Sequence, residues 1–492
     1  MTGHILRQSR RALPEAGDAL MLKPRSGLIL ALALGILAII ASLAIRPLMP
    51  PDETRYVQVA REMRLSGNFV VPHFEGEPYP DKPPLLFWLM NLAWMLLGDH
   101  GWVARMISPT TGLLCVALTW WIARRLWPDR ADVAGTAALI LAGGLAWCGY
   151  STLVMFDAPL TACVLGALGA GLLAARRVAT SMSPFVLVGA CLGLGILAKG
   201  PMTLLHALPA LLAAPMWIRH ADDARKESFP WRRWYGGLVA AFVIGAAIAL
   251  CWALPAAARG GPEFGLDMLW NQTANRMVRA FAHARPPWWY LLVLPIALAP
   301  WSLWLGAWTA MGRLRAEMDP GLRFCLAWIV PGFALLSLVS GKQAHYLLPL
   351  LPGIALMLAR LLGPAPRVTQ RNVLPVALGF AAVGIALLAV GSFARAHAGA
   401  LPEGMTPAFV HLRLVEPWLL VLVGVVLAIG LPRLRTGHVA ALALAGVLGV
   451  VLVQASITGW GGAHRRTWPP WQEKHGDGET GRSPDPVMAA RP

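Results

Sequence analysis

The sequence predicts an all-α protein that crosses a membrane about 13 times, at about 20 apolar residues per crossing. Charged residues make up 14% of the 492 residues, against about 25% in typical soluble domains, and the mean hydropathy is +0.57. Long apolar runs recur from residue 27 to residue 458. The candidate spans are 27–46, 103–124, 131–149, 158–175, 184–198, 201–218, 236–256, 288–310, 322–339, 345–362, 373–392, 416–432 and 438–458.

The basic residues predict the orientation of the spans, because Lys and Arg accumulate in cytoplasmic loops. The basic stretch 1–26 is expected to be a retained cytoplasmic N-terminus. If the ambiguous apolar run 83–98 also crossed, every later basic cluster would lie outside. We therefore expect 83–98 to be a juxtamembrane or re-entrant helix within the first external loop, 47–102. The clusters kept inside are Arg124-Arg125, Arg176-Arg177, residues 219–233, Arg313 to Arg315 and Arg433 to Arg435.

The net charge of +17 fits this distribution of basic residues better than it fits a nucleic-acid partner. The chain is expected to form one transmembrane domain over 27–458. Residues 459–492 are rich in Pro, Gly and charge and predict a disordered external tail. The six cysteines lie in or beside apolar runs without any CxxC pair, which favours small core residues over disulfides or a metal site.

In this topology, the polar residues that are hard to explain as loop filler all fall on the external side. Charged groups at membrane depth are expensive and usually functional. Several that converge from separate loops predict one site. They are Asp52-Glu53, Tyr79, Asp81-Lys82, Asp157, Lys199, the loop 257–287, Lys342, His345 and Tyr346.

Two signals lie in the first external loop. Asp52 and Glu53 follow the first span, where a carboxylate could accept a proton from an attacking hydroxyl or position it; the alternative is an amphipathic interfacial helix that Asp52 caps. Lys82 precedes Pro83-Pro84 and a helix start, a position suited to binding a phosphate. Its alternative is a lysine that reaches the membrane interface.

Two further signals interrupt later apolar runs. Asp157 stands just before a helix start led by Pro159, so it is either a site residue or an N-cap. Lys199-Gly200-Pro201 predicts a broken helix, which is tolerated at depth only where protein or a cavity lines it. Lys199 is then a candidate phosphate ligand, or else a loop lysine at the interface.

The loop 257–287 carries Arg276 and Arg279, which run against the tendency for external loops to lack basic residues. They predict an anionic partner, because Arg binds phosphate in a bidentate manner. A divalent metal (Zn or Mg) shared by Asp81 and His283 is a weak option, since two ligands from distant loops form no signature. No DxD motif for a nucleotide-sugar and no P-loop for ATP is present in the sequence.

Taken in order, these motifs resemble the aminoarabinose transferase and protein-mannosyltransferase superfamily (glycosyltransferase family 39). The resemblance covers residues 51–352, and Asp81 replaces the glutamate usual at that position. The matching motifs are Asp52-Glu53-x-Arg55-Tyr56, Pro78-Tyr79-Pro80-Asp81-Lys82-Pro83-Pro84, Asp157-Ala158-Pro159, Ala198-Lys199-Gly200-Pro201, Pro287-Trp288-Trp289-Tyr290, and Gly341-Lys342 with Tyr346-Leu347-Leu348-Pro349.

The resemblance implies the GT-C glycosyltransferase fold and an inverting transfer of a sugar such as aminoarabinose or mannose from undecaprenyl phosphate. The acceptor would be an anionic lipid such as lipid A, or a protein, on the periplasmic face of a bacterial inner membrane, with no required cofactor. It implies catalytic roles for Asp52, Asp157 and Glu53, and an acceptor or pocket role for Lys342, His345 and Tyr79. Donor-phosphate ligands would be Lys82, Lys199, Arg55, Arg276, Arg279 and Tyr346.

A lipid flippase or small-solute transporter is the alternative. It would also need many spans, broken helices and basic residues. Transporters typically contain inverted repeats and binding groups near mid-membrane. No repeat is evident in this sequence, and its acidic residues gather at one surface, so the sequence favours the transferase.

Overall fold

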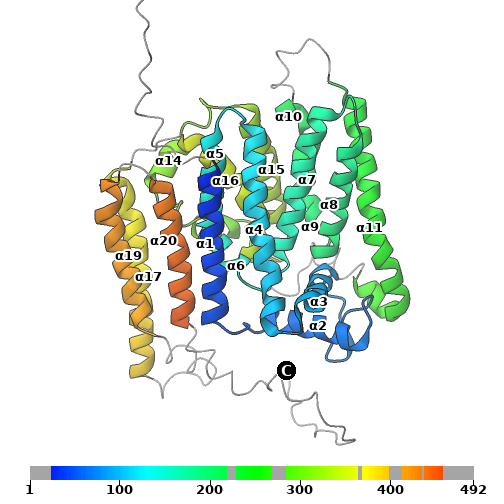
Figure 1. Ribbon diagram of the computed structural model, residues 1–492, viewed down its shortest axis with the longest axis horizontal. Helices are drawn as coiled ribbons and strands as arrows, with labels where there is room; N and C mark the ends of the chain where they lie inside the picture. The colour runs from blue at the N-terminus through cyan, green and yellow to red at the C-terminus, as the bar shows by residue number, and fades with distance from the viewer. Residues whose placement is uncertain are drawn as a thin grey trace, which may run out of the picture.

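The structure is a computed structural model that describes residues 24–218, 229–268, 284–363, 368–397, 413–434 and 437–457. Figure 1 shows a bundle of mostly upright helices with a small layer across one end. The first half comprises α1 (Pro24–Ile45), α2 (Asp52–Ser66), β1 (His73–Phe74), β2 (Glu77–Pro78), α3 (Leu85–Leu97), α4 (Gly101–Leu126), α5 (Ala131–Ala142), α6 (Leu145–Ser151), α7 (Asp157–Arg177), α8 (Ser183–Lys199), α9 (Met202–Leu212), α10 (Ala214–Ile218) and α11 (Trp231–Leu266).

The second half of the described chain is also helical. It comprises α13 (Trp289–Ala297), α14 (Leu305–Met311), α15 (Pro320–Leu338), the 3-10 helix η3 (Ala344–Leu350), α16 (Leu351–Leu362), α17 (Gln370–Ala396), α19 (Val415–Gly430), the 3-10 turn η5 (Leu431–Arg433) and α20 (His438–Ile457). Together these elements confirm the predicted all-α polytopic membrane fold.

Nine helices within the described ranges are long and apolar enough to cross a membrane, and the bent pair α5–α6 adds a tenth, with 64° between its halves. The predicted runs 184–198, 201–218 and 288–310 form shorter helices instead. Gly200, at φ +65°, ends α8 directly after Lys199. Tight turns over 298–304 divide α13 from α14, although the sequence there reads as one apolar run.

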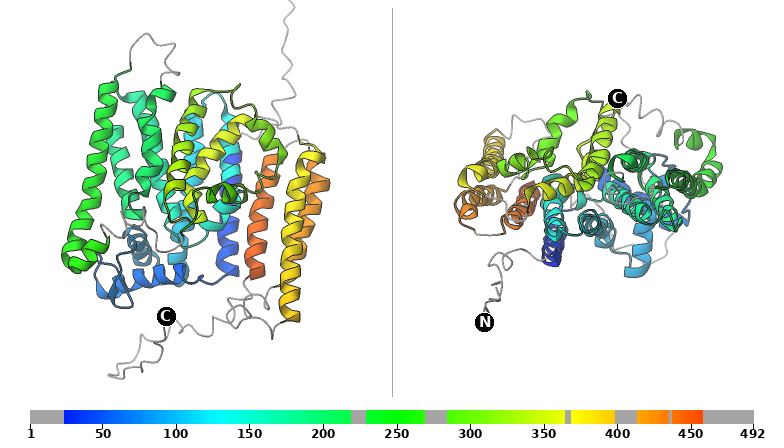
Figure 2. Two further views of the ribbon diagram at one scale, coloured as in Figure 1. Left: turned by 180° about the vertical axis from the view of Figure 1, so that it is seen from behind. Right: turned by 90° about the horizontal axis from the view of Figure 1, so that it is seen from above.

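The helices α2 and α3 lie across one end of the bundle (Figures 1 and 2). At 13 residues, α3 is about 20 Å long, well short of the roughly 30 Å hydrocarbon core. This is the juxtamembrane helix expected from the run 83–98. A separate apolar cluster, which includes Tyr56, Met63, Phe87 and Phe156, fixes this layer against the bundle.

The basic helix ends gather at the opposite end of the bundle from α2 and α3 (Figure 1). Arg176 Nη2, at the end of α7, donates to the Arg125 carbonyl at the end of α4, over 2.7 Å. Arg233, at the start of α11, donates to the Ala179 carbonyl. The structure therefore separates the basic clusters from the candidate site, as the positive-inside tendency requires.

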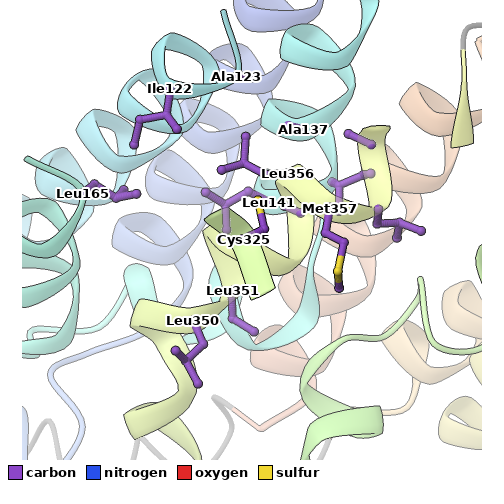
Figure 3. Packing of buried hydrophobic residues seen from close by; sticks show 14 of the residues in the cluster. Ile122, Ala123, Ala137, Leu141, Leu165, Cys325, Leu350, Leu351, Leu356 and Met357 are labelled. Atoms are coloured by element: carbon purple, nitrogen blue, oxygen red, sulfur yellow. The ribbon is translucent and has the colours of Figure 1, made fainter. Parts of the chain in front are cut away.

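The main core lies where α4, α5, α7, α15 and α16 meet (Figure 3), with Ile122, Leu141, Leu165, Cys325 and Leu356 packed together. Small residues let helix backbones approach closely, as is common in membranes. At the contact of α20 with the end of α5, a Cβ added to Gly446 would lie 2.1 Å from the Gly143 carbonyl oxygen. In Figure 1, α20 lies between α1 and the α17–α19 pair. All six cysteines are free.

Candidate active site

The candidate site lies at the end of the bundle covered by α2 and α3, where several chain breaks meet. The end of α1, the start of α2, the loop 79–82, the segment between α6 and α7, the end of α8 and η3 converge there. Each break exposes backbone or charge that an unbroken helix would not. The site residues predicted from separate apolar runs are thereby brought together.

An ion pair between Asp157 and Lys199 is the centre of the site. Asp157 begins α7 and Lys199 ends α8, and Lys199 Nζ lies 2.7 Å from Asp157 Oδ1. The Asp157 side chain is 1% exposed and that of Lys199 is 13% exposed. A buried carboxylate needs such a counter-charge because desolvation is costly. The N-cap alternative for Asp157 is not what is seen, since Phe156 occupies the cap position.

Aromatic rings surround this pair. Lys199 Nζ lies 4.4 Å from the centre of the Tyr346 ring, a favourable cation–π distance. The His345 ring packs edge-on against Tyr346, with ring centres 4.8 Å apart, and lies 5.4 Å from the Tyr150 ring. His345 Nε2 is 3.8 Å from Asp157 Oδ2. The predicted residues His345 and Tyr346 therefore belong to the same cluster as Asp157 and Lys199.

Asp52 lies in the first turn of α2 and is partly exposed. The Tyr56 hydroxyl donates a hydrogen bond to Asp52 Oδ1 over 3.3 Å. Burial, followed by the charge of Asp52, raises the pKa of Tyr56 well above its ordinary value, so the phenol stays a donor. The Tyr56 ring packs edge-on against Phe156, with centres 4.9 Å apart. Phe156 immediately precedes Asp157, so this contact links the two acids.

Lys82 and Tyr79 lie in the loop that follows the β1–β2 hairpin, where β1 and β2 pair antiparallel. Lys82 is partly exposed, and its Nζ lies 3.5 Å from the Asp81 carbonyl oxygen. The guanidinium of Arg55 is near enough to Tyr79 to influence its pKa. Burial and the charge of Asp81 raise the pKa of Tyr79 to about 12, against the opposing effect of Arg55. Tyr79 is therefore a neutral donor near the lysine.

Two of the predicted residues are occupied by structural contacts. Glu53 is 2% exposed and accepts hydrogen bonds from Arg46 and from the backbone N–H groups of Met49 and Val154. Lys342 is 2% exposed and donates to the carbonyls of Arg285 and Val339. Glu53 and Lys342 therefore bind neighbouring segments of the chain to one another and do not line an open pocket.

Three predicted residues, Arg276, Arg279 and His283, lie outside the described residues. Asp81 is described, and among the residues that the structure covers no group of three His, Cys, Asp or Glu side chains could hold a metal ion. The metal option based on Asp81 therefore has no support from the described geometry.

Sequence reasoning missed two buried groups near the site. Arg46 follows the last residue of α1 and looked like an ordinary basic flank of a span. His206, on α9, is fully buried, and neither ring nitrogen has a hydrogen-bond partner among the described residues. The charges of Lys199 and Asp157 act on it. The signal that could have identified His206 is its position seven residues after Lys199, just beyond the predicted helix break at Gly200-Pro201.

The arrangement offers a carboxylate paired with Lys199, and a second lysine, Lys82, in the loop across the same end of the bundle. Ammonium groups bind phosphate as point charges, and a carboxylate opposite them can orient a hydroxyl or accept its proton. A separate apolar cavity of about 260 Å³ lies within the bundle. Its lining includes Trp147, one turn before Tyr150, and Leu351, five residues after Tyr346. The charged cluster therefore suits an anionic group, and the cavity suits an apolar one.

Comparisons with known proteins agree with this description. Residues 81–252 match the family model described as dolichyl-phosphate-mannose-protein mannosyltransferase. A relative from Pseudomonas fluorescens (strain Pf0-1), named undecaprenyl phosphate-alpha-4-amino-4-deoxy-L-arabinose arabinosyl transferase 1, is 32% identical over 320 residues, 63% of this chain and 53% of that protein. The transferase of the same name from Erwinia tasmaniensis is 30% identical over 364 residues, 72% of this chain and 64% of that protein.

The chain therefore spans between about half and two thirds of the length of these curated relatives. Among solved structures, ArnT from Cupriavidus metallidurans bound to undecaprenyl phosphate aligns with a TM-score of 0.69 at 24% identity. The alignment covers 89% of this chain and 78% of that one. The match shows that the two chains share a fold, the GT-C fold expected from the sequence.

Proposed function

This chain belongs to the superfamily of aminoarabinose transferases and protein mannosyltransferases, and on that premise we propose that it transfers a sugar from undecaprenyl phosphate to an acceptor. The observation that carries the proposal is the Asp157–Lys199–Tyr346 cluster. It lies at the end of the bundle that also carries the segments of Asp52 and Lys82. The sugar is aminoarabinose, mannose or a similar residue. The acceptor is an anionic lipid such as lipid A, or a protein.

In the proposed reaction, an acceptor oxygen forms a bond to the anomeric carbon while the bond from that carbon to the donor phosphate breaks. The electron pair leaves with the phosphate oxygen, so the leaving phosphate gains one negative charge. Lys82 and Lys199 stabilise this charge where it develops. If the acceptor is a hydroxyl, its proton passes to Asp52; if the acceptor is itself a phosphate, Asp52 only orients it. Attack opposite the leaving group inverts the anomeric centre.

The apolar cavity supports a lipid-linked donor. Its described lining combines side chains of α5, α6, α13, α14, α15 and α16 and is almost wholly apolar. A cavity with such a lining suits part of an isoprenoid tail. The transfer needs no nucleotide-sugar, and this proposal involves no cofactor.

The distribution of charge supports an orientation for the reaction. The basic helix ends lie away from α2, which favours a cytoplasmic N-terminus. The candidate site then faces the periplasm of a bacterial inner membrane. The transporter alternative gains no support from the relatives, which are named as transferases, or from the family model.

The test is a transfer assay with purified protein in liposomes and a panel of undecaprenyl-phosphate sugars, offered with lipid A or a peptide acceptor. Release of undecaprenyl phosphate should depend on the acceptor and should be lost in Asp52→Asn. The matched control is Asp99→Asn, which removes a half-exposed carboxylate on the same side of the bundle without touching the cluster. Wild-type protein that binds undecaprenyl phosphate but transfers no sugar would refute the proposal.

A further inference from the structure

A buried ion pair joins the segment that carries Asp52 to the segment that precedes Asp157. Arg46 follows the end of α1, and Glu53 is the neighbour of Asp52 in α2. The two side chains are 3% and 2% exposed. Neither is open to a substrate, although Glu53 looked from the sequence like a second catalytic carboxylate.

Both oxygens of Glu53 are already engaged. Oε2 accepts from the Met49 backbone N–H over 2.7 Å and from Arg46. Oε1 accepts from the Val154 backbone N–H over 2.6 Å. Charge-assisted hydrogen bonds of this kind are about twice as strong as neutral ones. The carboxylate therefore joins the entry of α2 to the segment that precedes Asp157.

Arg46 is bound on several sides as well. Its Nε donates to Ser42 Oγ over 2.8 Å, and its Nη2 donates to the Thr152 carbonyl. The rest of the segment is anchored to α4, because Ser108 Oγ bonds both the N–H and the carbonyl of Met155. Non-helical backbone at membrane depth needs such partners. The segment 152–156 is therefore held by the side chains of Arg46, of Glu53 in α2 and of Ser108 in α4.

We propose that Arg46 and Glu53 are positioning residues that fix Asp52 relative to the Asp157–Lys199 pair, and that Glu53 takes no proton in the reaction. Asp52 is the residue next to Glu53, and Asp157 lies three residues after Val154, which Glu53 binds. The Tyr56–Phe156 contact makes a second, apolar link between the same two segments. The kinetic part of this inference rests on the proposed function; the structural part does not.

The test compares Glu53→Gln, Arg46→Gln and the double variant in detergent. Removing one partner of a buried pair leaves an uncompensated charge, whereas removing both charges does not. Each single variant should lower the unfolding midpoint, and the double variant should lose less than the sum. Additive losses would show that the two residues are not coupled and would overturn the inference.

Turnover is then measured per undecaprenyl phosphate binding site, so that unfolded protein does not count. A displacement of about 1 Å between reacting groups can cost about 100-fold in rate. We expect Glu53→Gln to lower kcat by about 10- to 100-fold with little change in KM for the donor and the same pH profile. An unchanged kcat per site would mean that the Arg46–Glu53 pair contributes to stability but not to turnover. Loss of the acidic limb of the pH profile would mean that Glu53 is the base that accepts the proton. Either result overturns the proposal.

A different measurement decides the structural part if wild-type protein transfers no sugar, an outcome that would refute the proposed function alone. Hydrogen exchange of the backbone amides in 49–56 and 152–157 reports on both joined segments. In Glu53→Gln, exchange should quicken in both segments and stay unchanged in α17, the internal control, which packs on α19 and α14. Unchanged exchange in both segments would show that Glu53 does not hold them together and would overturn the structural part of the inference.

Discussion

Replacing Lys199 with methionine is expected to have two effects that can be measured separately. The first concerns stability, because Lys199 Nζ lies 2.7 Å from Asp157 Oδ1 and Asp157 is 1% exposed. The other carboxylate oxygen has no hydrogen-bond partner among the described residues. His345 Nε2 lies 3.8 Å from that oxygen, beyond hydrogen-bonding distance. Methionine would keep the volume of the side chain and leave the carboxylate buried without its counter-charge.

The size of the effect follows from this burial. Removing one partner of a buried ion pair typically costs about 3–5 kcal/mol, while replacing both partners is often neutral. Lys199→Met should therefore lower the free energy of unfolding by about 3–5 kcal/mol. The double variant with Asp157→Asn should recover most of that loss, because no unpaired charge remains. The pair can be measured by chemical unfolding in detergent, with both single variants as references.

The second effect concerns the donor. The double variant should be folded but should bind undecaprenyl phosphate at least 10-fold more weakly, since a hydrogen bond to a charged group contributes about 1.5–3 kcal/mol. The reasoning fails if Lys199→Met is as stable as wild type, or if the double variant is no more stable than the single one. If the double variant binds undecaprenyl phosphate as tightly as wild type, Lys199 does not bind the phosphate.

Three further predictions concern residues around this pair. Lys82→Met should weaken undecaprenyl phosphate binding about 10- to 100-fold and leave the unfolding midpoint unchanged; binding titration and thermal unfolding check this, and an unaltered affinity would place the phosphate elsewhere. The pKa of Tyr79 is about 12 in the fold and about 10 in an unfolded chain, so its contribution to stability should be lost as pH rises from about 10 to 12. The free energy of unfolding should fall less steeply across that pH range in Tyr79→Phe than in wild type. Identical slopes in the two proteins would contradict the raised pKa of Tyr79. His206→Leu should be at least as stable as wild type, because the imidazole has no hydrogen-bond partner among the described residues and burying it is costly; a lower unfolding midpoint would show that the ring makes an important contact.

Much of the candidate site was predictable because charge at membrane depth is rare and therefore informative. Asp157 and Lys199 lie in separate apolar runs, and the orientation argument alone assigned them to one side. The structure brings them to 2.7 Å and adds His345 and Tyr346. Their predicted catalytic and binding roles remain predictions for the experiments above.

Other features could not be read from the chain. Asp52 and Glu53 look equivalent in sequence, but successive residues on a helix point about 100° apart, so one faces the site and the other faces Arg46. Arg46 itself was indistinguishable from the many basic residues that flank membrane spans. The turns over 298–304 left no trace in composition, because an apolar run shows no difference between a straight helix and a broken one.

The position of α20 has a consequence for the order in which the bundle assembles. This helix is the last one described along the chain, yet it packs between α1, the first, and the α17–α19 pair, with its backbone against that of α5. Chains are synthesised from the N-terminus, and their early parts fold first. While synthesis continues, the surfaces of α1 and α5 that α20 will cover must face lipid or one another. α1 and α5 therefore reach their final packing only after α20 has entered the membrane, so a truncation before α20 would disturb α1 as well as remove α20.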